Sequence, residues 1–256
     1  MVKTQCAARM RLHGVVALLC ILGCSRGRVT AREDQNEYVE DVVAFTNSTK
    51  EQVREKMKQG SVPLKEEWEA WEKQGPMTPD RVKAFYKQTA NYIYELGQWH
   101  LWDASKRQSD LALVEDMRTK YMPTNILDFG GGVGINAFFL ARAGFGVTLA
   151  DLDSTTLRFA MFRAERRGIR LKVWKSDVEP AAPDKKYDVI LALDVLEHLP
   201  KDELDTVVDK LIQLKHAKTE IIMTAPFGRT AMHPMHMDED EHTKRQVHRL
   251  KTELPK

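Results

Sequence analysis

Short apolar runs alternate with amphipathic segments along the chain from residue 125 onward. The short runs predict strands, and apolar residues that recur every three or four positions predict helices. The strands expected from this pattern cover residues 126–129, 147–150, 171–174, 187–193 and 220–225. Because strand and helix alternate, we expect an α/β fold: a Rossmann-like, doubly wound and mostly parallel sheet with helices on both faces.

Residues 30–123 show helical spacing, so we expect a helical N-terminal cap ahead of a core over 124–230. Thr78 and Pro79 mark a helix start, with threonine as N-cap and proline in the first turn. The helix that opens there is expected to carry the aromatic residues Phe85, Tyr86, Tyr92, Tyr94, Trp99 and Trp102. Such a stripe usually packs against the main domain, and the alternative is a lid over a substrate pocket.

The composition, with 43% hydrophobic and 30% charged residues, is that of an ordinary soluble globular chain. The net charge of +2 is divided unevenly, because residues 1–30 hold five basic groups and no acid, while the remainder holds 34 basic and 37 acidic groups. A slightly acidic body has no electrostatic footprint for nucleic acid, so no nucleic-acid partner is expected. The cysteines are Cys6, Cys20 and Cys24. Their position excludes a disulfide, a Cys–zinc site and a cysteine nucleophile from the body.

The leader, residues 1–29, combines basic residues with an uncharged apolar run over 14–24. This pattern is typical of a secretory signal, and the segment that ends at Cys24 also resembles a bacterial lipoprotein box. The run is short for a membrane span, which takes about 20 apolar residues. The alternative interpretation is a spurious leader, with translation starting downstream, for example at Met57.

A glycine-rich loop joins the first predicted strand to its helix, with Asp128 two residues ahead of it. Gly130, Gly132 and Gly134 give the spacing G-x-G-x-G, whereas the dinucleotide fingerprint would need a glycine at Ile135. Glycines let the backbone approach a ligand closely, and the helix N-terminus behind them offers free N–H groups. The loop therefore predicts a ligand site other than a dinucleotide site.

Three more acids follow successive predicted strands. Asp151 ends the second strand, Asp177 follows the third and Asp194 follows the fourth. The carboxyl ends of parallel strands meet at one edge of the sheet, where open α/β folds bind their ligands. We therefore expect these acids to face the glycine loop across one site.

The ordered motifs over about 125–228 resemble the class I S-adenosylmethionine-dependent methyltransferases. The segments that carry the resemblance are 126–134, 149–153, 176–178 and 194–199. The resemblance implies S-adenosylmethionine as cofactor, with its methionine end on the backbone of Gly130, Gly132 and Gly134 and its amino group near Asp128.

The same resemblance assigns the nucleoside end of the cofactor. Asp151 would accept hydrogen bonds from the ribose hydroxyls, since a carboxylate can accept two. Asp177 would face the adenine amine, and the Val178 N–H would face a ring nitrogen.

The function expected is methyl transfer to a small-molecule acceptor by in-line displacement. Because the sulfonium is already activated, the protein supplies alignment and, where needed, a base. Candidates for a catalytic role are Asp194, His198 and His233. The alternative from a different class is a catalytically silent methyltransferase-like module that binds the cofactor or a partner.

Carboxylates and imidazoles also gather after the fourth and fifth predicted strands. Asp194, Glu197, His198 and the later His236 would suit a divalent cation. The arrangement is similar to metal-dependent small-RNA 2′-O-methyltransferases and ubiquinone-pathway O-methyltransferases, with aspartate instead of glutamate at the first position. We expect no metal, and keep metal-assisted O-methyl transfer as an alternative.

Residues 231–256 are expected to form a His-containing loop and a charged helix over 238–254, with His242 and His248 facing solvent. The fold usually carries two more strands after the fifth, and 28 residues do not hold them after that helix. We therefore expect missing edge strands and an exposed sheet edge suited to a homodimer. The expected location is cytoplasmic, where the cofactor is made, with membrane anchoring or export through residues 1–28 as the alternative.

Overall fold

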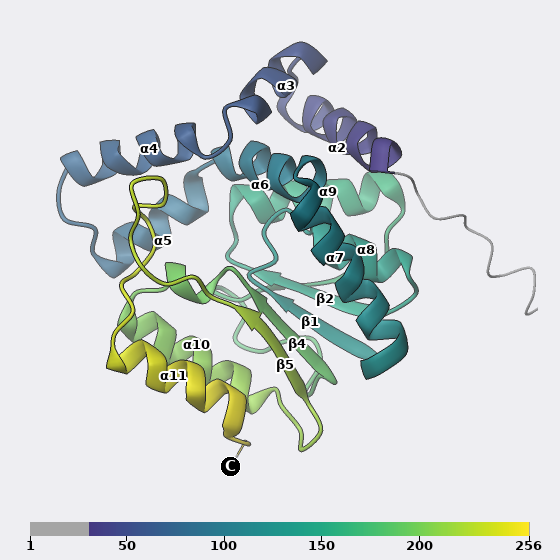
Figure 1. Ribbon diagram of the computed structural model, residues 1–256, viewed down its shortest axis with the longest axis vertical. Helices are drawn as coiled ribbons and strands as arrows, with labels where there is room; N and C mark the ends of the chain where they lie inside the picture. Colours follow the sequence, from purple (N-terminus) through teal and green to yellow (C-terminus); the bar gives the residue numbers. More distant parts are fainter. Residues whose placement is uncertain (1–30, 256) are drawn as a thin grey trace, which may run out of the picture.

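Five strands form the centre of the computed structural model, which describes residues 31–255 (Figure 1). In chain order they are β1 (Asn125–Phe129), β2 (Gly146–Asp151), β3 (Lys172–Lys175), β4 (Val189–Leu193) and β5 (Glu220–Thr224). Their order across the sheet is β3-β2-β1-β4-β5, and every pairing is parallel. The Rossmann-like α/β prediction is confirmed, and the described sheet is wholly rather than mostly parallel. The leader and the three cysteines lie outside the described residues.

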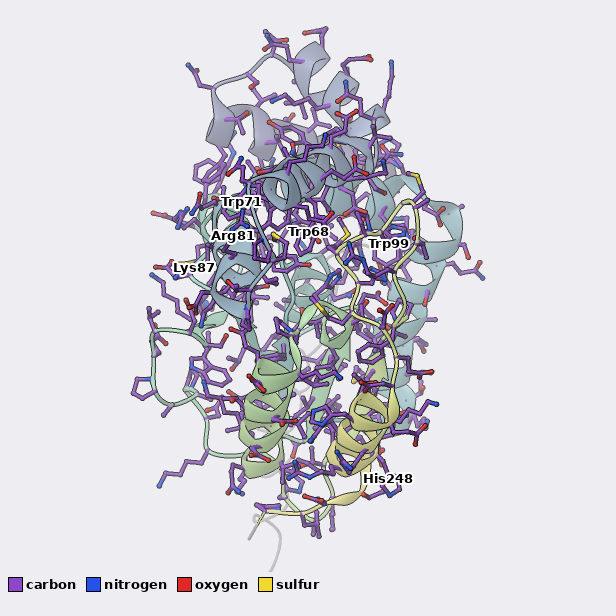
Figure 2. The ribbon with its side chains drawn as sticks, turned by 90° about the vertical axis from the view of Figure 1, so that its left-hand side faces the viewer. Trp68, Trp71, Arg81, Lys87, Trp99 and His248 are labelled. Carbon is purple, nitrogen blue, oxygen red and sulfur yellow. The ribbon has the colours of Figure 1, made fainter. Side chains whose placement is uncertain are left out.

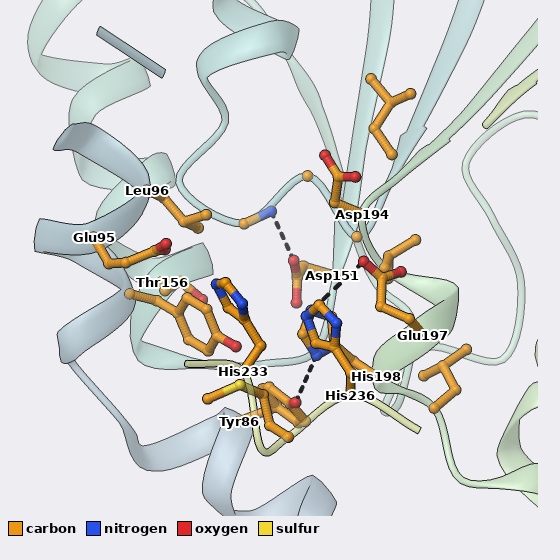
Figure 3. Close-up of a pocket in the computed structure, with 18 of the residues that line it drawn as sticks. Tyr86, Glu95, Leu96, Asp151, Thr156, Asp194, Glu197, His198, His233 and His236 are labelled. Carbon is orange, nitrogen blue, oxygen red and sulfur yellow. Dashed lines mark hydrogen bonds and ion pairs between the residues drawn. The ribbon is translucent and has the colours of Figure 1, made fainter. Parts of the chain in front are cut away.

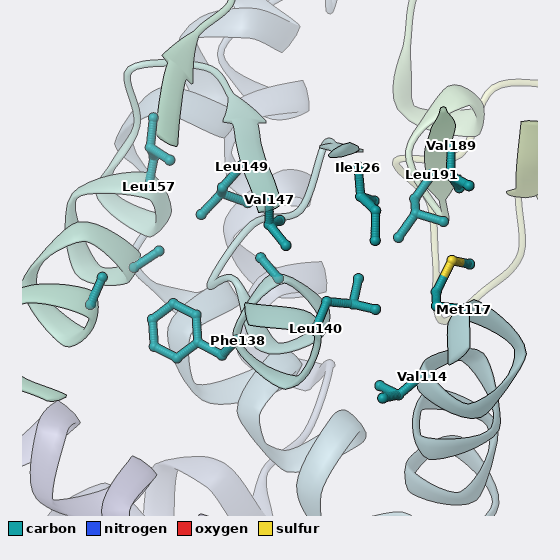
Figure 4. Packing of buried hydrophobic residues seen from close by; sticks show 13 residues of the cluster. Val114, Met117, Ile126, Phe138, Leu140, Val147, Leu149, Leu157, Val189 and Leu191 are labelled. Carbon is teal, nitrogen blue, oxygen red and sulfur yellow. The ribbon is translucent and has the colours of Figure 1, made fainter. Parts of the chain in front are cut away.

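Helices cover both faces of the sheet. One face carries α7 (Ala104–Asp116), the π-helical turn η1 (Met117–Tyr121), α8 (Ile135–Arg142) and α9 (Thr155–Arg167), and the other carries α10 (Lys201–Gln213) and α11 (Glu241–Thr252). Figure 4 shows how Phe138 and Leu140 of α8 point toward the strands. The neighbouring strand residues Ile126 and Leu127 enter opposite clusters, as the two-residue period of a strand requires. This double burial explains the nearly continuous apolar strand sequences.

The N-terminal helices form a cap at the carboxyl ends of the strands (Figure 1). They are α2 (Ala31–Thr46), α3 (Lys50–Lys58), α4 (Val62–Lys73), α5 (Pro79–Gln88) and α6 (Asn91–Trp102). The Thr78 side chain accepts a hydrogen bond from the Arg81 N–H, which confirms the predicted helix start. Figure 2 shows Trp68, Trp71 and Arg81 close together in this cap.

The expectation of one aromatic-rich helix is wrong, because the chain leaves the helix at Thr89. The backbone of Thr89 is extended, with ψ 134°. Its hydroxyl donates to Glu67 at 2.6 Å and accepts from the Asn91 N–H at 3.2 Å, so the side chain ends α5 and starts α6. Threonine competes with the helix backbone in this way. The break divides the aromatic residues between two helices, α5 and α6.

A buried ion-pair cluster ties the cap to the sheet domain. Asp41 of α2 is fully buried and lies 3.4 Å from Arg163 and 2.9 Å from Arg167 of α9. Arg163 also donates to the carbonyl of Val133 in the glycine loop at 3.0 Å, and its guanidinium lies over the Tyr38 ring. The cluster therefore connects the first described helix to the backbone of the glycine loop.

The C-terminal helix α11 packs on α10, with Leu250 buried between them and the Lys215 ammonium donating to its carbonyl at 2.8 Å. Within residues 31–255 no strand pairs with the outer edge of β5. His248 is exposed as predicted (Figure 2), whereas His242 is half-buried and lies 2.8 Å from Asp205 of α10. Among the helices of this described part, none is both long and apolar enough to cross a membrane.

Candidate active site

A cavity of about 1150 Å³ lies between the cap and the carboxyl ends of the strands (Figure 3). The sheet side contributes the glycine loop and the acids that follow the strands, and the cap side contributes α5, α6 and the start of α7. The predicted site residues that line it are Asp128, Gly130, Gly132, Asp151, Asp177, Asp194, Glu197, His198, His233 and His236. Gly134 and Val178 do not line it.

The glycine loop has conformations and contacts that only glycine fits. Gly130 and Gly132 adopt φ of 72° and 53°, in the left-handed region. A Cβ on Gly130 would lie 2.2 Å from the Val195 side chain, and one on Gly132 would lie 2.9 Å from Leu96 of the cap. Gly134, with φ 75°, caps α8 instead. The loop is therefore closed in from the β4 side and from the cap, and its backbone faces the cavity.

Two carboxyls flank this loop, the fully buried Asp128 and the partly buried Asp151. Asp128 is 2% exposed and its Oδ2 has no hydrogen-bond partner. Burial raises the pKa of Asp128 to about 7, and it raises the pKa of Asp151 to about 6. Asp151 accepts hydrogen bonds from the N–H groups of Gly132 at 2.8 Å, drawn in Figure 3, and Leu152 at 2.7 Å. Both carboxyls line the cavity and have lone pairs left to accept hydrogen bonds from a ligand.

Asp177 also lines the cavity, and helix α5 of the cap contacts it. Lys87 of α5 lies 2.7 Å from its Oδ2, and the Asp153 N–H donates to its Oδ1 at 2.8 Å. Although burial opposes the effect, these contacts hold the pKa of Asp177 below its usual value. The Val178 N–H is already bonded to the Lys175 carbonyl at 3.1 Å. No sequence signal distinguished Lys87 from an ordinary surface lysine.

Glu197, His198 and His236 form a compact group whose potential ligand atoms lie within 4.8 Å of one another. Glu197 and His198 belong to the short 3-10 helix η2 (Leu196–His198) after β4. Glu197 is fully buried, and neither of its carboxyl oxygens has a hydrogen-bond partner. Burial, together with the neighbouring His236 and His233, lowers the pKa of His198 to about 3. Figure 3 shows the three imidazoles facing the cavity beside Glu197.

The imidazoles are oriented by contacts from both sides. The Tyr86 hydroxyl lies 2.8 Å from His198 Nδ1, and His236 Nδ1 lies 3.0 Å from the Pro226 carbonyl. A carbonyl only accepts, so His236 carries its proton on Nδ1 and turns the Nε2 lone pair away from Pro226. Met235 anchors the loop by burying its side chain with Trp68 in the cap.

Asp194 stands apart from this group. Its backbone adopts φ 53°, which is strained for a residue other than glycine. Its Oδ1 accepts from the Thr224 hydroxyl at 2.8 Å, and its Oδ2 lies 3.4 Å from the Lys106 ammonium. Of the four residues expected as the metal alternative, the structure thus brings three together, and Asp194 is held by other partners. His198, His233 and His236 lie side by side and are called the imidazole group below. Of the catalytic candidates, His198 and His233 belong to it.

The aromatic residues of the cap are divided between buried positions and the cavity wall. Phe85 and Tyr94 are buried in the cap, whereas Tyr86, Tyr92 and Trp99 line the cavity. The carboxyl of Glu95 on α6 also lines it, and burial raises the pKa of that carboxyl to about 7. From the sequence, Glu95 was not predicted to belong to the site, and the aromatic side chains were considered only under the alternative of a lid.

The sequence over residues 126–216 matches the family described as "Methyltransferase domain". This part of the chain is therefore similar to methyltransferase domains. The chain is 35% identical over 88 residues to a "Ubiquinone biosynthesis O-methyltransferase" of Rickettsia conorii, covering 34% of this chain and 30% of that one. It is 33% identical over 86 residues to the protein of that name from Paramagnetospirillum magneticum, covering 34% of each. The chain thus spans about a third of the length of these curated relatives.

Among solved structures, the chain is similar to a magnesium protoporphyrin IX methyltransferase from Synechocystis with bound S-adenosylmethionine. The identity is 21% and the TM-score 0.44, and the match covers 62% of this chain and 72% of that one. An N-methyltransferase from Bradyrhizobium japonicum matches with 17% identity and a TM-score of 0.47, over 57% of this chain and 83% of that one.

Proposed function

We propose that the chain transfers the methyl group of S-adenosylmethionine to a small-molecule acceptor held under the helical cap. The observation that carries the proposal is the glycine loop. Gly130 and Gly132 hold left-handed backbone conformations and line the cavity between two carboxyls, Asp128 and Asp151. The cavity of about 1150 Å³ lies just above the roughly 300–1,000 Å³ of small-molecule sites, which leaves room for an acceptor beside the cofactor.

The residues of the cavity take distinct roles in this proposal. The unpartnered Asp128 oxygen accepts from the cofactor's ammonium, and Asp151 accepts from the ribose hydroxyls. Asp177 lies at the adenine end. Gly134 shapes the loop as the cap of α8, and Val178 supports the turn after β3, since its N–H is bonded within that turn.

The bound sulfonium supplies an activated methyl group, so the chain's own task is to align the acceptor and take its proton. We propose His233 as the base, because it lines the cavity and its ring stacks on that of His236 with 5.0 Å between the ring centroids. His198 is a weak base with its pKa lowered to about 3, and it serves to position the acceptor with Tyr86. Asp194 fixes the turn after β4.

Calorimetric titration with S-adenosylhomocysteine tests the cofactor half of the proposal. We expect saturable binding with a Kd well below about 1 mM, and absence of heat at millimolar ligand would contradict it. Transfer of a labelled methyl group to a panel of phenols, amines and thiols tests the second half. Intact binding without transfer to any acceptor would favour the silent-module alternative.

A second candidate function, metal-assisted O-methyl transfer, is favoured by Glu197. Its two buried oxygens have no partner, and they face two imidazoles. A divalent cation would satisfy this carboxylate, and nitrogen and oxygen donors suit Mn²⁺, Fe²⁺ or Zn²⁺. Glu197, His198 and His236 would hold the ion, which would lower the pKa of an acceptor hydroxyl.

We expect Mn²⁺ to stabilise the protein if this group binds metal. At 100 times its Kd, a ligand of the folded state adds about 2.7 kcal/mol to the free energy of unfolding. Thermal unfolding with and without Mn²⁺ measures the effect, and Glu197→Gln should abolish it. Glu203→Gln, which neutralises another carboxyl of the cavity wall, should retain it. Equal Mn²⁺ stabilisation of both variants would place the ion elsewhere.

We further propose a homodimer through the outer edge of β5, which has no strand partner within residues 31–255. The cytoplasm is the location we propose, because the methyl donor is made there. Sedimentation velocity tests the dimer, and a monomer at micromolar concentration would contradict it.

A further inference from the structure

The cavity is richer in acids than in bases, which bears on the acceptor of the proposed methyl transfer. The inference that follows rests on that proposed function. Of the residues that the structure describes, eight acids line the cavity, against three lysines and no arginine. A cleft lined by charges of one sign concentrates ions of the opposite sign. The cavity therefore favours a cationic ligand.

The lysines of the cavity do not neutralise Glu95 of α6. Each acts on another group: Lys106 lies 3.4 Å from Asp194, Lys210 donates to the Ser176 carbonyl at 3.2 Å, and Lys83 acts on Glu203. Within residues 31–255 the Glu95 carboxyl has no hydrogen bond or ion pair. Its pKa of about 7 reflects burial alone, since no cation of the described chain lowers it. Glu95 is thus a carboxyl of the cavity wall that still lacks a partner.

Glu95 lies in the middle of the α6 face that lines the cavity. Tyr92, Glu95, Leu96 and Trp99 all line it, at spacings of three and four residues that place them on one side of a helix. Figure 3 shows the Glu95 carboxyl pointing into the cavity. Its neighbours one turn before and one turn after are the aromatic Tyr92 and Trp99. A cation bound to this carboxylate would therefore lie next to both rings.

The two rings beside Glu95 are suited to a cation, because aromatic faces attract cations within about 6 Å of the ring centre. Trp99 already does so, since the Lys106 ammonium lies 4.3 Å from the centre of its ring. The Tyr92 ring stacks on that of Tyr86 with 5.9 Å between the centroids. Because these contacts hold both rings in place in the free protein, a ligand pays little side-chain entropy to use them.

A second carboxyl without a partner faces the same cavity. Glu197 is fully buried, and neither of its oxygens accepts a hydrogen bond within the described chain. The charges of Glu95 and Glu197 both act on the Tyr92 hydroxyl, so both carboxyls lie near this ring. Glu95 does not belong to the group of potential metal ligands around Glu197. The metal alternative therefore supplies no cation for Glu95.

We propose that the methyl acceptor is an amine, which enters the cavity as an ammonium ion and is held by Glu95 beside the rings of Tyr92 and Trp99. The ammonium donates hydrogen bonds to the carboxylate, and the apolar part of the acceptor packs against the aromatic side chains of the cap. The excess of acids disfavours acceptors that bear a carboxylate or a phosphate at this position. The helical cap thereby selects the acceptor by its charge.

Calorimetric titrations with ligands that differ in their end group test this proposal. One set is 2-phenylethylamine, 2-phenylethanol and 3-phenylpropionate, and the other is 1-hexylamine, 1-hexanol and hexanoate. The chain is first saturated with S-adenosylhomocysteine, which lacks the sulfonium charge, at pH 8, where Glu95 is ionised and the amines are protonated. A hydrogen bond to a charged group corresponds to roughly a 10- to 100-fold change in Kd. In each set the amine should therefore bind about 10- to 100-fold more tightly than the alcohol, and the carboxylate should bind most weakly.

Glu95→Gln keeps the size of the side chain and removes its charge, so the amine and the alcohol of each set should bind this variant equally well. Glu203→Gln is the matched control, because it neutralises another carboxyl of the cavity wall, one on which Lys83 acts. This variant should retain the preference for the amine. EDTA in every titration keeps divalent cations away from Glu197.

Equal binding of amine and alcohol by the wild-type chain, failure of both amines to bind, or a preference that survives in Glu95→Gln would overturn the proposal. Because the wild-type comparison needs no variant, a poorly folded Glu95→Gln leaves the proposal testable. If Glu95 bound the cofactor's sulfonium instead, Glu95→Gln would weaken S-adenosylmethionine relative to S-adenosylhomocysteine, and the wild-type chain would show no preference for amines. If S-adenosylhomocysteine did not bind, the proposed function itself would fail, whereas its binding without a preference for amines would overturn this inference alone.

Discussion

Asp151→Ala is expected to weaken binding of S-adenosylhomocysteine about 100-fold or more. The carboxylate faces the cavity with both oxygens fixed by the N–H groups of Gly132 and Leu152. In the proposed complex its remaining lone pairs would accept the two ribose hydroxyls, and hydrogen bonds to a charged group contribute about 1.5–3 kcal/mol each. Calorimetry on the variant and the wild type measures the loss.

Asp153→Ala is the matched control for Asp151→Ala. Asp153 lies two residues further on, is about one-third exposed, and pairs only loosely, at 3.4 Å with Lys175 and 3.9 Å with Arg158. Its side chain does not line the cavity, so we expect the affinity to change less than about twofold. Equal losses in the two variants would show that Asp151 acts through the fold of the segment.

The affinity for S-adenosylhomocysteine should also depend on pH. Burial raises the pKa of Asp151 to about 6 and that of Asp128 to about 7. The ionised carboxylates bind the ligand better, so affinity should be full above pH 7 and fall as the pH decreases through 7 and then 6. Asp151→Asn should remove the lower step and leave the upper one.

Replacing Asp41 with alanine is expected to lower the free energy of unfolding by about 3–5 kcal/mol. The fully buried carboxylate neutralises Arg163, whose side chain is only 7% exposed. Removing one partner of a buried pair leaves an uncompensated charge. For a chain of this size the loss corresponds to a fall in Tm of roughly 6–20 °C, measured by calorimetry or circular dichroism.

Glu40→Ala serves as the comparison, since Glu40 precedes Asp41 on α2 and its carboxylate is 42% exposed. Exposed pairs contribute about 0–1 kcal/mol, so the Tm should change little. A loss no larger for Asp41→Ala than for Glu40→Ala would mean that water reaches Arg163. Because Arg163 also holds the Val133 carbonyl, Asp41→Ala should weaken cofactor binding as well.

The sheet and its acids were predicted well, because both depend on short sequence patterns. A buried parallel strand needs a continuous apolar run, and topology then brings the residues after each strand to one edge. Asp128, Asp151 and Asp177 could be placed on that edge without any knowledge of distant contacts. The turn at Gly130 could be placed in the same way, since its spacing alone pointed to a close approach.

The cap's contribution could not be predicted, because it depends on contacts between distant segments. Lys87 and Asp177 are 90 residues apart, and Lys106 and Asp194 are 88 apart. In the sequence, neither lysine can be distinguished from an ordinary lysine on a helix surface. The four residues of the metal alternative do not all come together, since the left-handed Asp194 turns its carboxylate toward Thr224.

One short helix of the cap reaches both ends of the cavity. Neighbouring residues of α5 contact the imidazole group through Tyr86 and Asp177 through Lys87. A displacement of α5 as a rigid helix would therefore break both contacts at once. If the proposed cofactor and acceptor exchange by that route, they share one opening step, and that step limits turnover whenever methyl transfer is faster.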